Sequence, residues 1–338
     1  ARERIYAAGG DDARPADNGR LDRAEPLANP ARASKGDVMR RSRLPLVGLA
    51  SLVILGGLGG SAVAQAAESE NAAWPRLIRN VAYGEDDGLR QVLHVLEPEP
   101  RATSRPAVVF FHGGGLVVGL PIADLTWAEA IVEQGYVAFM AGYRLFDERT
   151  GGNPWPALID DAQRAIRWIR AHADEVNVDP ERVCAIGHSA GGHLASLVGT
   201  TEAADATDPE LAGISSRVNC VVTLAGDGDL TVPYENTRWT SVFTKMFGGT
   251  IEEVPETWQA ASPAHNIDEE TVPFLIIHGN RDGDVPVEMA RNLADALAEA
   301  GKEYVLAEVP AGHMGIRGPQ ATDALVEAFL DYQLHPDA

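Results

Sequence analysis

The sequence predicts an α/β fold in which a mostly parallel, eight-stranded sheet is covered by helices on both faces. Residues 107–111 and 273–277 are continuously apolar, which is typical of strands buried on both faces of a parallel sheet. Such runs alternate with amphipathic helical segments, and this alternation indicates three layers. At 187–191 an apolar run passes through a glycine-rich turn into a helix of small residues, a strand–turn–helix junction.

The first two expected strands flank an acidic turn with a glycine and predict an antiparallel hairpin at the start of the sheet. The expected strands are 77–83, 90–96, 106–111, 136–141, 182–187, 218–225, 273–278 and 304–309. The expected helices are 123–134, 156–172, 190–199, 287–300 and 321–332. The segment 227–262 breaks the alternation and carries several aromatic residues, so we expect a small lid or pocket wall there.

The beginning of the chain differs in composition from the rest. Residues 1–38 have no apolar period, and we expect an upstream extension outside the fold. A basic start, the apolar run 44–58 and small-residue A-x-A sites follow, which predicts a secretory signal peptide over 39–66. A membrane anchor is the alternative, but the run is short and rich in glycine. The folded domain is then 67–338, and the protein is expected to be secreted or periplasmic.

The chain has 338 residues and a formal net charge of −21. Such an acidic surface disfavours nucleic acid and anionic lipid, so we expect neither a nucleic-acid partner nor stable membrane association. The oligomeric state stays open. Cys184 and Cys220 both lie in apolar strands and are expected to be buried free thiols, although export would permit a disulfide.

Two motifs indicate nucleophilic chemistry. Ser189 is the centre of G-x-S-x-G between a strand and a helix, the context of a nucleophile elbow. A serine hydroxyl needs a base and an oxyanion site. Directly after strand 106–111 comes His112-Gly113-Gly114-Gly115, where backbone N–H groups of Gly113 or Gly114, with that of Ala190, would form an oxyanion hole. The alternative for this run is a flexible glycine turn.

An acid and a base follow the serine in the chain. Asp282 and Asp284 lie on the loop after strand 273–278, and the residues alone do not separate them. His313 stands on a glycine-flanked loop after the last strand. The order serine, aspartate, histidine is that of α/β-hydrolases.

From about residue 81 to 313 the chain resembles the α/β-hydrolase superfamily. Within it, the chain resembles the HGGG-type esterase/lipase group, and especially the bacterial feruloyl-esterase-like (BD-FAE) branch. The matching segments are Tyr83-Gly84, His112 to Gly115 with Gly119, Tyr143-Arg144-Leu145, Val178 to Arg182, Gly187 to His193, Ala261-Ser262-Pro263, and His278-Gly279 with Asp282 and Val285-Pro286.

The resemblance implies which residues act. In the family the acid stands four residues after the strand-end histidine, which implies Asp282, with Asp284 as the second candidate. We expect the substrate to contact His112, Gly115, Leu116 and His188.

The chain also departs from the family pattern. Leu116 stands where the family often has tryptophan, which would reshape the acyl pocket, and His94 stands where an aspartate is usual. Arg144 and Asp161 are expected to be structural.

His188 and His193 could suggest a metal site. Family elbows carry both without a metal, so we expect packing roles for them, no metal and no cofactor.

These expectations describe an exported bacterial serine ester hydrolase for short to medium acyl or aryl esters, carried by small molecules or polymers. Ser189, His313 and Asp282 would act through an acyl-enzyme. Three alternatives stay open. The first is an arylformamidase or small serine peptidase on the same scaffold. The second is a hydrolase of polymeric or aromatic polyesters of the cutinase or PET type. The third is a non-catalytic binding module that kept the fold.

Overall fold

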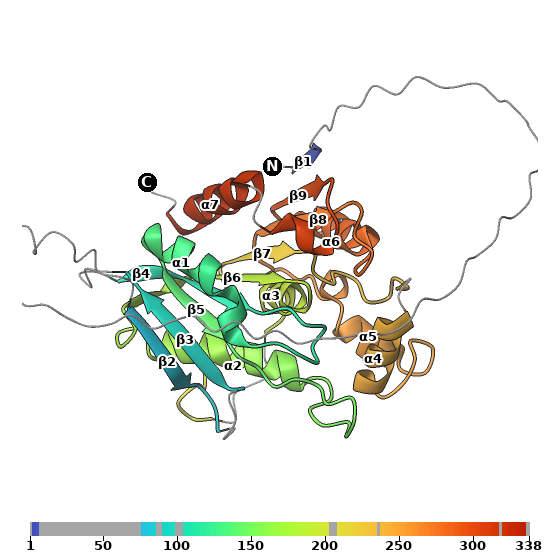
Figure 1. Cartoon of the computed structure of the whole chain (residues 1–338), viewed down its shortest axis with the longest axis horizontal. Helices are drawn as coiled ribbons and strands as arrows, with labels where there is room; N and C mark the ends of the chain where they lie inside the picture. The colour runs from blue at the N-terminus through green and yellow to red at the C-terminus, as the bar shows by residue number, and fades with distance from the viewer. Residues whose placement is uncertain are drawn as a thin grey trace, which may run out of the picture. The chain divides into compact units, whose positions relative to one another are not determined.

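The structure is a computed structural model (Figure 1). It describes residues 2–6, 76–85, 90–98, 104–202, 208–234, 237–317 and 320–335. The expected signal peptide, 39–66, and most of the expected upstream extension, 1–38, lie outside the described residues. Within the described residues, no helix combines the length and the apolar character that a membrane span requires.

The strands form one sheet in the order β1-β9-β8-β7-β6-β4-β5-β3-β2. The β2–β3 and β3–β5 pairs are antiparallel and every other pair is parallel, so the mostly parallel sheet and the initial hairpin are confirmed. β1 is a ninth strand, additional to the eight expected ones. The strands are β1 Arg2–Tyr6, β2 Arg76–Ala82, β3 Val92–Glu97, β4 Arg105–Phe111, β5 Val137–Ala141, β6 Val178–His188, β7 Cys220–Leu224, β8 Phe274–Gly279 and β9 Tyr304–Val309.

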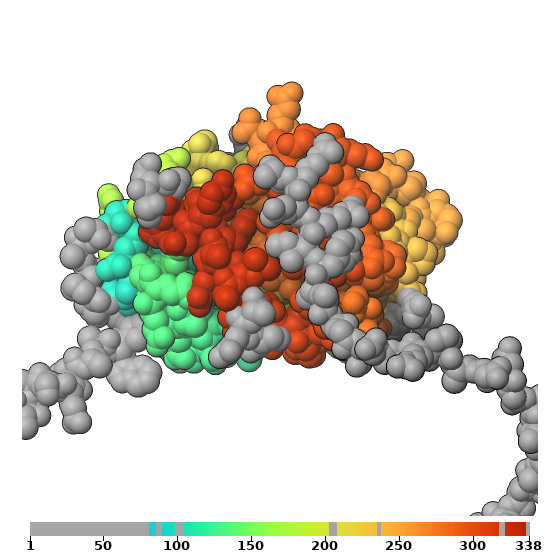
Figure 2. All heavy atoms as spheres, turned by 90° about the horizontal axis from the view of Figure 1, so that it is seen from above, coloured from blue at the N-terminus to red at the C-terminus, as the bar shows by residue number. Residues whose placement is uncertain are grey.

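Helices cover both faces of the sheet, which confirms the three layers (Figure 1). Side chains of β4 alternate between the faces: Val109 and Phe111 join the core beneath α2, α3 and α6, whereas Val108 and Phe110 join the core beneath α1 and α7. This alternation follows from the period of two along a strand. The helices are α1 Leu125–Glu133, α2 Ala157–Ala171, α3 Ala190–Thr200, α6 Val287–Glu299 and α7 Gln320–Leu334. Figure 2 shows α7, in red, beside α1, in green, on one surface.

The segment 227–262 contains two further helices, α4 Thr237–Phe247 and α5 Pro255–Ala260, which lie together away from the centre of the sheet (Figure 1). Three short 3₁₀ turns complete the described elements, at Pro121–Asp124, Pro263–His265 and His313–Ile316.

Cys184 and Cys220 are direct register partners on the parallel strands β6 and β7, and a disulfide joins them. Both residues are fully buried. The expectation of free thiols was therefore wrong, because it depended on which strands are neighbours. That information comes from the order of the sheet and not from the local sequence.

Arg144, which is partly exposed, and the buried Asp161 form an ion pair that fixes α2 to the chain after β5. The carboxylate of Asp161 accepts from Nε and Nη2 of Arg144, at 2.6–3.0 Å, and from its backbone N–H at 2.7 Å. The side-chain amide of Gln91 donates to the same carboxylate at 2.7 Å. This full set of partners offsets the cost of burying the charge. The two residues hold the fold together, as expected.

Candidate active site

Ser189 lies at the sharp turn between β6 and α3. Its backbone has φ +58° and ψ −128°, a conformation that L-residues adopt rarely and that marks a strained nucleophile turn. The Ser189 N–H donates to the carbonyl of Leu224 at 2.9 Å, and its own carbonyl accepts from the N–H of His193 at 3.0 Å. These bonds to β7 and α3 hold the turn in place.

Glycine is required on both sides of this turn. A Cβ added at Gly187 would overlap the backbone of Gly191, and one added at Gly191 would overlap the carbonyl of Phe111. The end of β4 therefore lies directly against the start of α3. The glycine pattern that identified the elbow in the sequence has this steric cause.

The second loop at this edge carries the expected oxyanion donors. A Cβ built on Gly113 would lie 2.9 Å from the carbonyl oxygen of His188 and 3.5 Å from Cβ of Ser189, so this loop runs beside the nucleophile. Ala190 is the first residue of α3, where backbone N–H groups have no partner within the helix. The structure thus brings Gly113, Gly114 and Ala190 together around the serine, where the helix dipole favours negative charge.

His313 and Asp282 form a hydrogen-bonded pair. Nδ1 of His313 lies 2.8 Å from Oδ2 of Asp282. The other carboxylate oxygen, Oδ1, accepts from the backbone N–H groups of Asp284 at 2.9 Å and of Val285 at 3.0 Å. Of the two aspartates on the loop, the structure thus places Asp282 on the histidine, whereas the side chain of Asp284 is exposed.

The charges of this pair stabilise each other. Burial alone would lower the pKa of His313, but the hydrogen bond and the negative charge of Asp282 outweigh it, so the pKa is raised above its usual value. Burial would raise the pKa of Asp282, but His313 and the two backbone N–H groups outweigh that effect and lower it. The aspartate is therefore ionised at neutral pH, and the histidine binds a proton more readily than a free imidazole.

Two other histidines hold the loops that carry this pair. Nε2 of His188 donates to the carbonyl of His313 at 2.9 Å. Nε2 of His278 donates to the carbonyl of Val285 at 3.0 Å. Burial lowers the pKa of both rings, that of His188 to about 4, so both are neutral at neutral pH.

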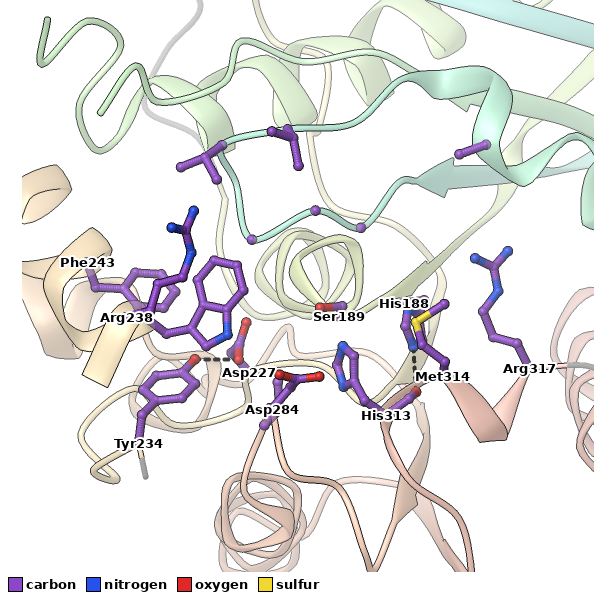
Figure 3. Close-up of a pocket in the computed structure, with 18 of the residues that line it drawn as sticks. His188, Ser189, Asp227, Tyr234, Arg238, Phe243, Asp284, His313, Met314 and Arg317 are labelled. Atoms are coloured by element: carbon purple, nitrogen blue, oxygen red, sulfur yellow. Dashed lines mark hydrogen bonds between the residues drawn. The ribbon is translucent and has the colours of Figure 1, made fainter. Parts of the chain in front are cut away.

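Ser189 and His313 line one cavity of about 370 Å³, together with Gly113, Gly114, Gly115 and His188. Figure 3 shows Ser189 between two groups of side chains: Tyr234, Arg238 and Phe243 on one side, and His313, Met314 and Arg317 on the other. The segment 227–262 supplies the first group, and its residues form this part of the cavity wall.

Two expected substrate contacts do not line the cavity. His112 is buried with its ring stacked on Tyr143, 4.3 Å between centroids, and the Tyr143 hydroxyl donates to the His112 carbonyl at 2.6 Å. Burial lowers the pKa of His112 to about 4. Leu116 is fully buried in the core. Both side chains are buried beneath the glycine loop and support it, so the structure does not place them at the cavity surface where the resemblance implied substrate contact. Gly115 and His188 do line the cavity.

Two buried carboxylates in the cavity wall were missed by the sequence analysis. Asp227 accepts a hydrogen bond from the Tyr234 hydroxyl at 2.5 Å. Asp124 accepts from Nη2 of Arg317 at 2.9 Å, and burial raises its pKa to about 6 although Arg317 opposes that shift. No local motif marks these residues, because loops far apart in the chain bring them to the pocket.

Ligand atoms of Asp282, Asp284 and His313 lie within 4.8 Å of one another and could hold a cation. However, the ring nitrogen of His313 that faces these carboxylates, Nδ1, already forms the hydrogen bond to Asp282. This arrangement suits a hydrogen-bonded pair rather than a metal centre. His193 is fully buried and its Nε2 donates to the carbonyl of Ala261 at 2.6 Å, which fits the expected packing role.

Comparison with known sequences identifies the family. A sequence model of the BD-FAE family matches residues 93–297, more than half of the chain. The chain belongs to the BD-FAE family. The BD-FAE match spans β3 to α6, so it includes the glycine loop, Ser189 and Asp282, and it ends before His313.

Several relatives are named esterases. "Esterase LipC" of Mycobacterium tuberculosis is 33% identical over 248 residues, which are 70% of this chain and 59% of LipC. "Probable carboxylic ester hydrolase LipM" of the same organism is 32% identical over 190 residues, 53% of this chain and 42% of LipM. The chain thus spans about half the length of these curated relatives.

Solved structures share the fold over most of their length. The Thermogutta terrifontis esterase Est2, with butyrate bound, has a TM-score of 0.64 at 29% identity and covers 79% of this chain and 97% of its own. A truncated carbohydrate esterase from gut microbiota has a TM-score of 0.68 at 24% identity, with 78% and 97% covered, and shows the fold alone. The α/β-hydrolase architecture expected from the sequence is therefore confirmed.

Proposed function

We propose that this chain is a serine hydrolase of carboxylic esters. One observation carries the proposal: Ser189, held at a strained elbow, shares a cavity with His313, whose Nδ1 is hydrogen-bonded to Asp282. Because Nδ1–H donates to the carboxylate, Nε2 is the nitrogen left to accept a proton. The esterase names of the relatives support the same activity.

The proposed reaction runs in two halves. Oγ of Ser189 attacks the ester carbonyl while Nε2 of His313 takes its proton, and Asp282 stabilises the imidazolium. N–H groups of Gly113 or Gly114 and of Ala190 bind the oxyanion. The C–O bond to the alcohol then breaks, and His313 gives its proton to the leaving oxygen. Water, deprotonated by His313, attacks the acyl-enzyme, and the carboxylic acid leaves with Ser189 restored.

We propose short to medium acyl or aryl esters as substrates. The cavity of about 370 Å³ accommodates a small ester, and Tyr234, Trp239 and Phe243 offer apolar surface to it. Butyrate bound to Est2 is consistent with this size. We expect rates to fall steeply beyond acyl chains of about eight to ten carbons, since pockets of a few hundred Å³ hold no more. We expect no interfacial activation, because the acidic surface disfavours adsorption to anionic lipid.

A panel of p-nitrophenyl esters from acetate to palmitate, with methyl ferulate and acetylated xylan, tests the activity and the substrate class. The Ser189→Ala variant should lose at least about 10⁴-fold in kcat while it remains folded. A fluorophosphonate should label the wild type on Ser189. A variant that keeps a tenth of the wild-type kcat would refute the proposal, and a palmitate rate above the butyrate rate, with a jump at the critical micelle concentration, would indicate a lipase.

Further substrates separate the alternatives. Formylkynurenine and small peptide amides test the arylformamidase or peptidase, and an aromatic polyester film tests the polymer hydrolase. If no substrate turns over and the fluorophosphonate does not react, the non-catalytic binding module is the better interpretation. We also propose export, because the basic, apolar and small-residue succession over 39–66 is typical of a signal peptide.

A further inference from the structure

The indole of Trp239, on α4, covers the glycine loop of the active site. A Cβ built on Gly115 would overlap the six-membered ring of Trp239 and lie 3.1 Å from its Cε3. The backbone of Gly115, with φ +60°, therefore forms the floor on which this ring lies. Trp239 itself lines the cavity and is partly buried against the core. The guanidinium of Arg238 lies 5.5 Å from the centre of the same ring.

Leu116, the residue after the glycines, does not line the cavity beside Trp239. Leu116 is fully buried in the core, and its carbonyl accepts from the N–H of Phe146 at 2.9 Å. Its side chain therefore leaves the space above Gly115 unfilled. Trp239, from a helix more than 100 residues away in the chain, fills that space instead.

The proposed chemistry indicates which part of the ester meets this wall. His313 must protonate the leaving oxygen, so the alcohol lies on the His313 side of the nucleophile. Figure 3 shows the α4 residues Arg238 and Phe243 on the opposite side of Ser189 from Met314 and Arg317. The acyl chain, attached on the other side of the carbonyl carbon, then extends toward α4.

We propose that Trp239 is the residue that limits the length of the acyl chain. This inference rests on the proposed ester hydrolysis and adds the specificity of its acyl side. The ring occupies the volume into which further methylene groups would extend. A smaller side chain would open that volume and let each added methylene be buried, which favours longer chains.

The test compares wild type with Trp239→Phe and Trp239→Ala on p-nitrophenyl acetate, butyrate, octanoate and laurate. In Trp239→Ala the ratio of kcat/KM for octanoate to that for butyrate should rise about tenfold or more, mainly through KM. Trp239→Phe should give an intermediate ratio. If the alanine variant does not fold, the phenylalanine variant decides, since it keeps an aromatic ring on α4.

Trp168 offers a matched control. It is also a partly buried tryptophan packed against the core, its ring stacks on His172 at 4.1 Å, and it does not line the cavity. Trp168→Ala should leave the octanoate-to-butyrate ratio unchanged.

Two results would overturn the inference. One is an unchanged octanoate-to-butyrate ratio in both Trp239 variants, including an equal loss for every chain length, which a purely structural role would give. The other is a change that follows the size of the alcohol in ethyl and benzyl esters rather than the acyl length. Absence of ester turnover in the wild type would instead contradict the proposed function, so the two failures are distinguishable.

Discussion

The ring of His188 donates a hydrogen bond from Nε2 to the backbone carbonyl of His313, at 2.9 Å. His188 is the residue before the nucleophile, and the two rings lie 4.8 Å apart between centroids. The end of β6 thus holds the loop that carries the proposed base. Burial lowers the pKa of His188 to about 4, so its ring is neutral at neutral pH, and the bond to the carbonyl requires its single N–H to be on Nε2.

Replacing His188 should impair the positioning of His313 rather than the binding of substrate. In His188→Ala we expect kcat for butyrate esters to fall about 10- to 100-fold with little change in KM, because small misplacements of a catalytic group are costly. His188→Gln, whose amide can donate, should keep more activity than the alanine variant. His172→Ala serves as the control, because His172 does not line the cavity. Equal kcat values for His188→Ala and wild type would contradict the positioning role.

The two aspartates of the β8 loop should differ strongly in effect. Asp282→Asn removes the acceptor that orients His313, and kcat should fall by about 10⁴-fold because the imidazole loses its oriented tautomer. Asp284→Asn should act mildly, since Asp284 contributes only charge near the histidine. Steady-state kinetics on both variants measures this. The reverse ranking would assign the acid to Asp284.

The pH profile should report the pKa of His313. The reaction needs the neutral base, so kcat/KM rises with pH through that pKa, which lies above the usual 6.5. In Asp282→Asn, the hydrogen bond and the negative charge of Asp282 are lost, so the pKa of His313 falls and the rising limb should move to lower pH. A limb that stays in place would show that another group controls the rate.

The disulfide should contribute stability without a role in turnover. Cys184 and Cys220 close a loop with a sequence separation of 36, and removing such a bridge typically costs about 2–5 kcal/mol. In the double variant Cys184→Ala/Cys220→Ala, urea unfolding should shift to lower midpoints while kcat/KM of the native protein stays within about twofold, because neither sulfur reaches the cavity. An unchanged midpoint would contradict the expected contribution.

Most of the sheet could be predicted because its strands are locally distinct. β5 is apolar throughout and β8 is apolar up to His278 near its end, and the observed ends differ from the expected ones by at most one residue. β6 begins earlier than expected, at Val178, because its pairing with β4 extends past Pro180. β1 was missed because it lies in the segment 1–38 that was expected outside the fold, and its charged start has none of the apolar continuity of the buried strands.

Some features of the site could likewise be predicted from local sequence, and others could not. The elbow at Ser189 and the glycine loop are local patterns with steric causes, so the sequence predicts them. The choice of Asp282 needed the family spacing, since both aspartates occupy the same loop. The disulfide, the bond from His188 to His313 and the position of Trp239 over Gly115 depend on strand order and on packing between distant segments, which no local pattern contains.

The proposed chemical groups follow β4, β6, β8 and β9, whereas α4 supplies the wall opposite His313. The proposed catalytic groups and the residues proposed to select the substrate thus lie in different segments of the chain. A chimera that exchanges residues 230–262 with those of a relative would leave every proposed catalytic group in its own loop. In evolutionary terms, such an insertion can drift or be replaced while the reaction is preserved, and one scaffold can give rise to enzymes for different esters.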